Sequence, residues 1–252
     1  MDHDILSPKP PASEWWEIIK TVLYAVILAL IIRSTVFEPF SIPSSSMVPT
    51  LLIGDYVIVN KYSYGYSRHS FPLSLPLFEG RIFFTQPQRG DVAVFKLPRD
   101  NKTDYIKRLV GLPGDEIQVK GGVLYINGKS VTRARLNDFI QDNGESKTRF
   151  AQYRETLPDS GVTHLILEMT EDGRFDNTPV YKVPAGHYFF MGDNRDNSMD
   201  SRAENIVGFV PEENLLGKAK YIFFSKANDT PWWEIWSLPL AIRWDRLFQS
   251  II

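Results

Sequence analysis

The sequence predicts a mainly β protein: a single N-terminal transmembrane helix, followed by an all-β core that carries an inserted smaller β domain. Three observations predict this fold class. Residues 21–32 form an uncharged apolar run, short apolar runs broken by Gly, Pro, Asn and Asp follow from residue 40, and the stretch 133–176 is polar and weakly patterned. After residue 40, no long stretch has the 3.6-residue apolar period of an amphipathic helix.

The composition limits the classes of function. The 252 residues are 43% hydrophobic, enough for one sizeable core or two modest domains. There are 28 Lys and Arg residues against 30 Asp and Glu residues, and no basic block, so we expect no nucleic-acid partner. Cysteine is absent, which excludes thiol catalysis and cysteine-based zinc sites.

The first forty residues predict the membrane helix. From Trp15 to Ile32 a helix would span about 27 Å, close to the thickness of the hydrocarbon core of a bilayer. The alternatives are a buried core helix and a cleavable signal peptide. The run ends directly in Arg33 and Ser34 with no small-x-small pattern, which disfavours cleavage. We therefore predict an uncleaved anchor, whose orientation the few flanking Lys and Arg residues leave open.

Five later segments predict strands joined by tight turns, because each is a short apolar run bounded by turn residues. Asn127 and Gly128 suit a two-residue hairpin turn. The segments are "DYVIVNKYSYG", "RGDVAVFKLP", "DYIKRLVGLPGDEIQVKGGVLYINGKSV", "GHYFFMGDN" and "GKAKYIFFS".

Three consecutive serines, Ser44, Ser45 and Ser46, lie in "EPFSIPSSSMVPTLLIGDY" between apolar flanks that favour burial. A serine cluster is usually a solvated loop, and a serine nucleophile needs a base to take its proton. None of the four histidines lies in a stretch that looks like a site, and there is no G-x-S-x-G, penicillin-binding-type Ser-x-x-Lys or H-E-x-x-H motif. We therefore expect no metal and no cofactor, and lysine remains as the candidate base.

Lys107 lies within the strand-like run 104–115 and is followed by Arg108. Strand alternation places these two cations on opposite faces, so at least one points inward. At the reference pKa, roughly one lysine in 250 is neutral at pH 8, but burial lowers the pKa and yields a usable general base. The competing interpretation is an edge strand from which both cations reach water.

The segment "MGDNRDNSMDSR", 191–202, is rich in Asp and Asn but fails the register of an EF-hand calcium loop. Two interpretations stay open from the residues alone. It is either a polar loop or a hydrogen-bonded scaffold in which Asp200 pairs with Arg202 and Ser198 orients a neutral amine.

Taken together and in this order, four blocks resemble the bacterial type I signal peptidase (leader peptidase) family. They cover about half of the chain and follow directly after the predicted anchor. The blocks are "PSSSMVPTLLIGDYVIVNKYSYG", "RGDVAVFKLP", "YIKRLVGLPGDEI" and "GDNRDNSMDSR". From the residues alone, the interpretation ends at a membrane-anchored β protein with a candidate Ser-Lys pair.

The resemblance implies a role for each matching residue. Ser46 would be the nucleophile, Lys107 the general base, and Ser44 an oxyanion-hole donor together with the Ser46 N–H. Ser198 would position the lysine amine, braced by Asp200 and Arg202. Ser45 stands where the family often has Gly. The expected substrate-binding residues, which form shallow pockets for small side chains, are Phe40, Ile42, Pro43, Met47, Leu51, Val94, Tyr105 and Ile106.

The resemblance also implies the biology: a serine endopeptidase of the bacterial cytoplasmic (inner) membrane, single-pass, with its catalytic domain on the periplasmic side. Its partners would be signal-peptide-bearing preproteins, cut after a small-x-small motif, and the lipid bilayer. The expected parts are an N-terminal tail (1–14), the transmembrane anchor (15–36), a first (37–115) and second (186–226) part of the catalytic β core, the inserted smaller β domain (116–185), and a Trp-rich membrane-interfacial segment (227–252).

Other functions and local interpretations compete with these. A membrane-tethered binding factor would keep the fold without turnover, and only an enzyme needs Ser46 and Lys107 within hydrogen-bond reach in one cleft. A self-cleaving regulator is disfavoured because no DNA-binding segment precedes the β region. Residues 67–87 form either an apolar flap or a covered loop. The C-terminal tryptophans lie either at the bilayer interface or against the β core.

Overall fold

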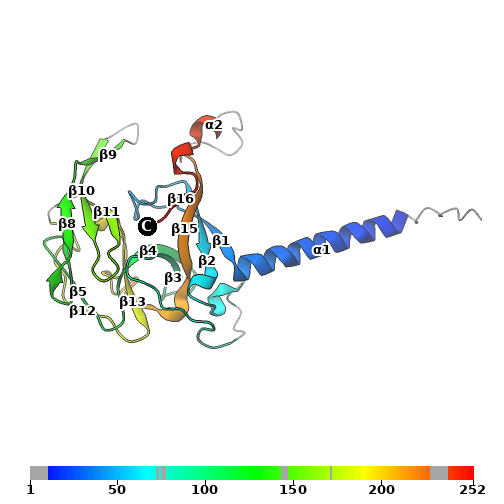
Figure 1. The fold of residues 1–252 in the computed structure, drawn as a ribbon, viewed down its shortest axis with the longest axis horizontal. Coiled ribbons are helices and arrows are strands. Elements are labelled where there is room, and N and C mark those ends of the chain that lie inside the picture. The colour runs from blue at the N-terminus through cyan, green and yellow to red at the C-terminus, as the bar shows by residue number, and fades with distance from the viewer. Residues whose placement is uncertain (1–10, 72–73, 75–77, 143–146, 171, 228–237) are drawn as a thin grey trace, which may run out of the picture.

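The computed structural model describes residues 11–71, 74, 78–142, 147–170, 172–227 and 238–252. It begins with one long helix that projects away from a body of β-strands (Figure 1). This helix, α1 (Pro11–Thr35), begins four residues before the predicted run and continues three residues beyond it. Its Glu14–Thr35 part is long and apolar enough to cross a membrane. Most of its apolar side chains are exposed rather than packed against the β body.

The β body is built around one curled sheet of eight strands, all antiparallel to their neighbours. The order is β1-β2-β15-β3-β4-β13-β14, and β16 pairs with β15. The strands are β1 (Phe37–Ser41), β2 (Asp55–Asn60), β3 (Val92–Lys96), β4 (Asp104–Gly111), β13 (His187–Met191), β14 (Val210–Pro211), β15 (Leu215–Ser225) and β16 (Gln249–Ser250).

Two four-stranded sheets formed by the middle of the chain lie on the side of the body away from α1 (Figure 1). One contains β8 (Thr132–Arg135), β9 (Phe139–Asp142), β10 (Lys147–Thr156) and β11 (Thr163–Glu168). The other contains β5 (Glu116–Lys120), β6 (Val123–Ile126), β7 (Lys129–Ser130) and β12 (Tyr181–Lys182).

The predicted fold class is confirmed, and so is the hairpin turn between β6 and β7. Asn127 and Gly128 have φ angles of 53° and 76°, the left-handed conformation that a two-residue turn of this kind requires. The edge-strand interpretation of residues 104–111 is wrong. β4 lies between β3 and β13, and both Lys107 and Arg108 are buried.

The apolar core holds the predicted serine loop in place. Met47 and Leu51 are fully buried and pack with Ile42, Val57 and Val94 from the large sheet. Because apolar side chains on both sides of the serines are buried, the loop that carries Ser44, Ser45 and Ser46 is fixed to the sheet, with Ser46 buried and Ser44 exposed.

The chain ends against the β body. Beyond the short helix α2 (Leu238–Ala241), Arg246 forms an ion pair with the fully buried Asp55 at 2.5 Å, and Ile251 packs against the core. Leu240, Trp244 and Phe248 are exposed. Trp232, Trp233 and Trp236 of the predicted interfacial segment lie outside the described residues.

Candidate active site

The serine loop meets β4 at Ser46 and Lys107. Lys107 Nζ donates a hydrogen bond to Ser46 Oγ at 2.7 Å and a second one to the Ile106 carbonyl oxygen at 2.9 Å. Both residues are buried, with 8% of Ser46 and 4% of Lys107 exposed. The pair therefore has hydrogen-bond geometry for proton transfer and little contact with water.

The surroundings of Lys107 favour its neutral form. Among the described residues, no carboxylate forms an ion pair with this amine, whose polar partners are the Ser46 hydroxyl and a carbonyl oxygen. Burial lowers the pKa of Lys107 from 10.5 to about 8, although the charges of Asp200 and Asp193 act in the opposite direction. At pH 8, about half of the molecules then hold a free amine.

The other two serines of the loop differ in their contacts. Ser44 Oγ lies 3.3 Å from Ser46 Oγ, and Ser44 is exposed at the mouth of the site. Ser45 Oγ accepts a hydrogen bond from Asn197 Nδ2 at 2.8 Å. Ser44 is thus beside the nucleophile candidate, whereas Ser45 ties the loop to the segment 191–202.

Segment 191–202 contains the Asp200–Arg202 pair that the scaffold interpretation expected. Arg202 binds Asp200 with two hydrogen bonds, from Nε at 2.9 Å and from Nη2 at 2.8 Å. Burial alone would raise the pKa of Asp200, but the Arg202 guanidinium keeps it below its usual range. Asp200 also accepts from the Gly192 N–H at 2.9 Å, which ties the pair to the end of β13.

Ser198 lines the same cavity as Ser46 and Lys107, but its hydroxyl forms no hydrogen bond with Lys107 Nζ and lies instead near Asp200, whose pKa it helps to lower. The structure thus brings Ser198 to the site without the bond to the lysine amine that the resemblance implies. Gly192 lies directly beside it. A Cβ at Gly192 would come within 2.2 Å of Ser198 Oγ and 2.5 Å of the Ser46 carbonyl oxygen, so only glycine fits there.

A cavity of about 860 Å³ opens over the pair. Six of the eight predicted substrate-binding residues line it: Phe40, Ile42, Pro43, Val94, Tyr105 and Ile106. The other two, Met47 and Leu51, are fully buried and do not line it. Their expected place in the pocket is therefore corrected to the core, where they support Ile42 and Val94 from below.

A buried ion cluster next to the pair was not predicted. Arg108 donates to Asp193 from Nε at 2.8 Å and from Nη2 at 2.7 Å, and Arg195 pairs with Glu155 on β10. His164 lies among these charges without a hydrogen bond to any described residue. Burial lowers the pKa of His164 to about 4, assisted by the Arg108 guanidinium.

This cluster holds the scaffold against the serine loop. Thr50 Oγ1 donates to Asp193 Oδ2 at 2.5 Å, and the next residue, Asn194, donates its N–H to the Ser46 carbonyl oxygen at 3.1 Å. Two features of the sequence pointed to this ion cluster: Arg108 directly follows Lys107, and Asp193 lies within the segment 191–202 that contains Asp200. The described residues contain no group of three or more His, Asp or Glu side chains arranged to hold a metal ion.

Comparison with known proteins relates both the helix and the site to one family. The sequence model of the signal peptidase family, peptidase S26, matches residues 15–224. Signal peptidase I from Rickettsia canadensis is 44% identical over 234 residues, covering 90% of this chain and 84% of that protein. The Rickettsia akari enzyme of the same name is 40% identical over 263 residues, covering 96% and 94%. In a crystal structure of a signal peptidase I from Enterococcus faecalis, the sequence is 30% identical to this chain. The match covers 53% of this chain and 97% of the Enterococcus chain, with a TM-score of 0.31.

Proposed function

This chain belongs to the signal peptidase family, peptidase S26, and we propose that it removes N-terminal signal peptides from exported preproteins by a Ser-Lys mechanism. Ser46 is the nucleophile and neutral Lys107 the general base. The observation that carries the proposal is the 2.7 Å contact between Lys107 Nζ and Ser46 Oγ in a buried setting where, among the described residues, no carboxylate forms an ion pair with the amine. This contact favours an enzyme over a binding factor that has kept only the fold.

Acylation begins with Lys107 as the free amine, to which the Ser46 hydroxyl then donates. As Ser46 Oγ attacks the scissile carbonyl carbon, its proton passes to Lys107 Nζ, and a tetrahedral oxyanion forms. Collapse of this intermediate breaks the carbon–nitrogen bond, and the Lys107 ammonium gives its proton to the leaving amine. The mature protein departs, the signal peptide remains as an ester of Ser46, and Lys107 is neutral again.

Deacylation repeats the proton transfer with water. Lys107 takes a proton from a water molecule that attacks the ester, and returns it to Ser46 Oγ as the signal peptide leaves. In both steps the charge develops on the same carbonyl oxygen. Ser44 Oγ lies 3.3 Å from Ser46 Oγ. We propose that the Ser44 hydroxyl donates to this oxyanion together with the Ser46 N–H.

The remaining predicted residues position the Lys107 amine or select the substrate side chains. Ser198 is proposed to contact the Lys107 amine when substrate fills the cavity, and the Asp200–Arg202 pair keeps Ser198 in place. The apolar lining over Ser46 accepts the small side chains before the cleavage point, which is the basis of the small-x-small preference. Extended substrate would pair with strand edges as an added strand.

The membrane arrangement is part of the proposal. An exposed apolar helix and the family make this a membrane-anchored enzyme. We place the β body on the periplasmic side of the bacterial cytoplasmic membrane, where preproteins emerge, with the lipid bilayer as its second partner.

The exposed Leu240, Trp244 and Phe248 near the C-terminus are proposed as a second, non-spanning contact with the bilayer. Truncation is a poor test, because it removes Arg246 and leaves the buried Asp55 without its ion pair. The triple variant L240S/W244S/F248S keeps that pair. Processing of a preprotein in vesicles should fall roughly two- to fivefold, with cleavage of a soluble peptide in detergent unchanged. Equal losses in both assays would assign the three side chains to the fold instead.

The direct test of the function uses the full chain in detergent. The protein is incubated with a purified preprotein, and the N-terminus of the new product is sequenced. The proposal predicts a single new N-terminus directly after a small-x-small motif, and no product with the Ser46→Ala variant. A cut at unrelated positions, or equal cleavage by the variant, would contradict it.

A further inference from the structure

A second cavity, of about 710 Å³, lies where α1 joins the β body. The last turns of the helix form part of its wall through Leu30, Arg33 and Ser34. It adjoins the active-site cavity, since both are lined by Arg33, Glu38, Phe40 and Asp104. The catalytic mechanism uses none of these four side chains for proton transfer.

Positive charge is concentrated in this cavity. Its lining contains five cationic side chains against three carboxylates, in a chain whose formal net charge is -2. The cations are Arg33, Lys61, Arg68, Lys96 and Lys102, of which Arg68 is paired at 3.2 Å with Glu213, a carboxylate outside the lining. A cavity of this composition attracts anions, because the local excess of positive charge opposes the sign of the whole protein.

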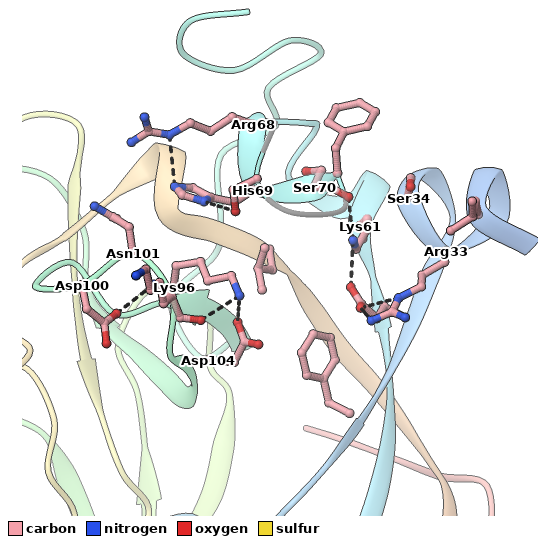
Figure 2. Close-up of a pocket in the computed structure, with 17 residues that line it drawn as sticks. Arg33, Ser34, Lys61, Arg68, His69, Ser70, Lys96, Asp100, Asn101 and Asp104 are labelled. Atoms are coloured by element: carbon pink, nitrogen blue, oxygen red, sulfur yellow. Dashed lines mark hydrogen bonds and ion pairs between the residues drawn. The ribbon is translucent and has the colours of Figure 1, made fainter. Parts of the chain in front are cut away.

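On one wall, two cations share a single carboxylate (Figure 2). Arg33 Nη2 lies 2.6 Å from Glu38 Oε1, and Lys61 Nζ lies 2.8 Å from Glu38 Oε2. Only 4% of the Lys61 side chain is exposed, so its charge is held where few water molecules reach it. One carboxylate cannot neutralise both charges, and a positive charge remains at this wall.

Lys96 comes from the opposite wall (Figure 2). Its amine binds Asp104 Oδ1 at 2.8 Å and the Lys102 carbonyl oxygen at 3.0 Å. The side-chain hydroxyl of Ser34 and the backbone carbonyl of Ser70, which accepts from Lys61 at 2.7 Å, complete a polar rim around the space. The cavity thus combines cations on two facing walls with the hydroxyl of Ser34.

The position of the cavity selects the kind of anion. Arg33 and Ser34 lie in the last turn of the candidate span Glu14–Thr35, at the depth where a bilayer changes from hydrocarbon to headgroups. Exposed apolar side chains lie near the end of α1. Val36 and Phe37 directly follow the helix, and Phe83 is 82% exposed. Phe83 is held near the helix because its neighbour Ile82 pairs with Tyr66, whose hydroxyl donates to the Thr35 carbonyl oxygen.

We propose that this cavity binds the phosphate of an anionic phospholipid headgroup, held between Arg33 and Lys61 on one wall and Lys96 on the other. The acyl chains would lie along the exposed apolar side of α1. The proposal requires the membrane anchor but not the Ser-Lys chemistry, so a binding measurement separates it from the proposed function.

The test uses the full-length protein in a neutral detergent. Short-chain phosphatidylglycerol is added below its own micelle concentration, and the rise in thermal unfolding midpoint gives an apparent dissociation constant. Short-chain phosphatidylcholine and inorganic phosphate are the two ligand controls. The variant R33Q/K96Q removes one charge from each wall. The control K120Q/K182Q makes the same change in charge on exposed residues of the small sheets.

We expect phosphatidylglycerol to raise the midpoint of the wild type and of K120Q/K182Q equally, and to bind R33Q/K96Q about tenfold or more weakly. If R33Q/K96Q does not fold, K96Q alone, outside α1, carries the test and should weaken binding several-fold. Three results would each overturn the proposal: an equal rise with phosphatidylcholine, an equal rise with phosphate alone, or unchanged binding by the cavity variants. A loss in K120Q/K182Q as large as that in R33Q/K96Q would also overturn it.

Discussion

Lys107 and Arg108 are neighbours on β4 and both are buried, but Arg108 has a carboxylate partner and Lys107 does not. Arg108 points into an ion cluster and binds the Asp193 carboxylate through two nitrogens, at 2.8 and 2.7 Å. Lys107 points to the other face of the strand and contacts a hydroxyl and a carbonyl oxygen. Both side chains are buried, but only Arg108 forms an ion pair with a carboxylate of the described residues.

The difference shows how one strand can carry the proposed base next to an arginine whose ion pair stabilises the fold. Burial disfavours a charged amine, and without an adjacent carboxylate the pKa of Lys107 falls to about 8. Next to it, the fixed charge of Arg108 is neutralised by Asp193, whose pKa burial would raise but Arg108 keeps below its usual range. The comparison predicts that changes at Lys107 affect catalysis and that changes at Arg108 or Asp193 affect folding.

The largest effect is expected at the pair itself. Ser46→Ala and Lys107→Ala should each lower kcat/KM for a peptide substrate by about 10⁴ or more, because a nucleophile and its base act as a unit. Lys107→Arg should be equally inactive, since a guanidinium does not take up a proton near neutral pH. The unfolding midpoint of the alanine variants should stay close to that of the wild type. Activity within tenfold of the wild type in either alanine variant would remove the pair from the mechanism.

Asp193→Asn should affect stability instead. It leaves the buried Arg108 charge without its partner, a loss of about 3–5 kcal/mol. The unfolding midpoint of the full chain in detergent should then fall by roughly 6–20 °C. Asp138→Asn, which affects a partly exposed ion pair on the small sheets, is the matched control and should shift the midpoint very little. A stable but inactive Asp193→Asn enzyme would mean that the two cations are not divided between catalysis and folding.

The serine loop allows a smaller, more specific change. Ser44→Ala should lower kcat by roughly 10² to 10³ with KM almost unchanged, because an oxyanion donor acts mainly in the transition state. Ser44→Thr keeps the hydroxyl and should retain much of the activity. Ser45→Ala removes only the contact with Asn197 and should have little effect. If Ser45→Ala is the more damaging variant, the roles of the two serines are assigned wrongly.

The smallest effect is a pH dependence from His164, the neutral member of the ion cluster. Its pKa is lowered to about 4, so below pH 6.5 the unfolded chain binds a proton that the folded protein does not bind. Between pH 7 and 5, stability should therefore fall by roughly 2 kcal/mol, or about 4–8 °C in midpoint. In His164→Leu this dependence should largely disappear, and an unchanged slope would assign it to other groups.

Local patterns in the sequence predicted most of the fold. The apolar run before Arg33, the strand-like segments and the turn at Asn127 and Gly128 each depend on neighbouring residues, and each appears where expected. The start of β4 was also visible, but the strand ends at Gly111 rather than at residue 115, and its neighbours were not predicted. Whether a strand lies at an edge or in the centre of a sheet depends on distant segments, here β3 and β13, and this is why the burial of Arg108 was missed.

From the residues alone, the sequence led to a candidate Ser-Lys pair, and the role of each site residue came from the resemblance. Nothing in the local pattern brings Lys107 to Ser46, 61 positions apart in the chain. Met47 and Leu51 were expected in the pocket because the sequence does not distinguish an apolar residue that lines a pocket from one buried in the core behind it. Asp193 and Glu155 were missed because their partners, Arg108 and Arg195, are brought to them by separate strands and loops.

The central claim is that Lys107 is a neutral base because it is buried without a counterion, and the pH dependence of kcat/KM tests it most directly. The full chain in neutral detergent is assayed on a short soluble peptide from pH 6 to 10.5. A lowered pKa means that the free amine forms as the pH rises through about 8. The value of kcat/KM should therefore be half-maximal near pH 8, reach its plateau at higher pH and stay constant there. A profile that still climbs tenfold per unit above pH 9 would show that Lys107 keeps the pKa of an ordinary lysine, and would contradict the account.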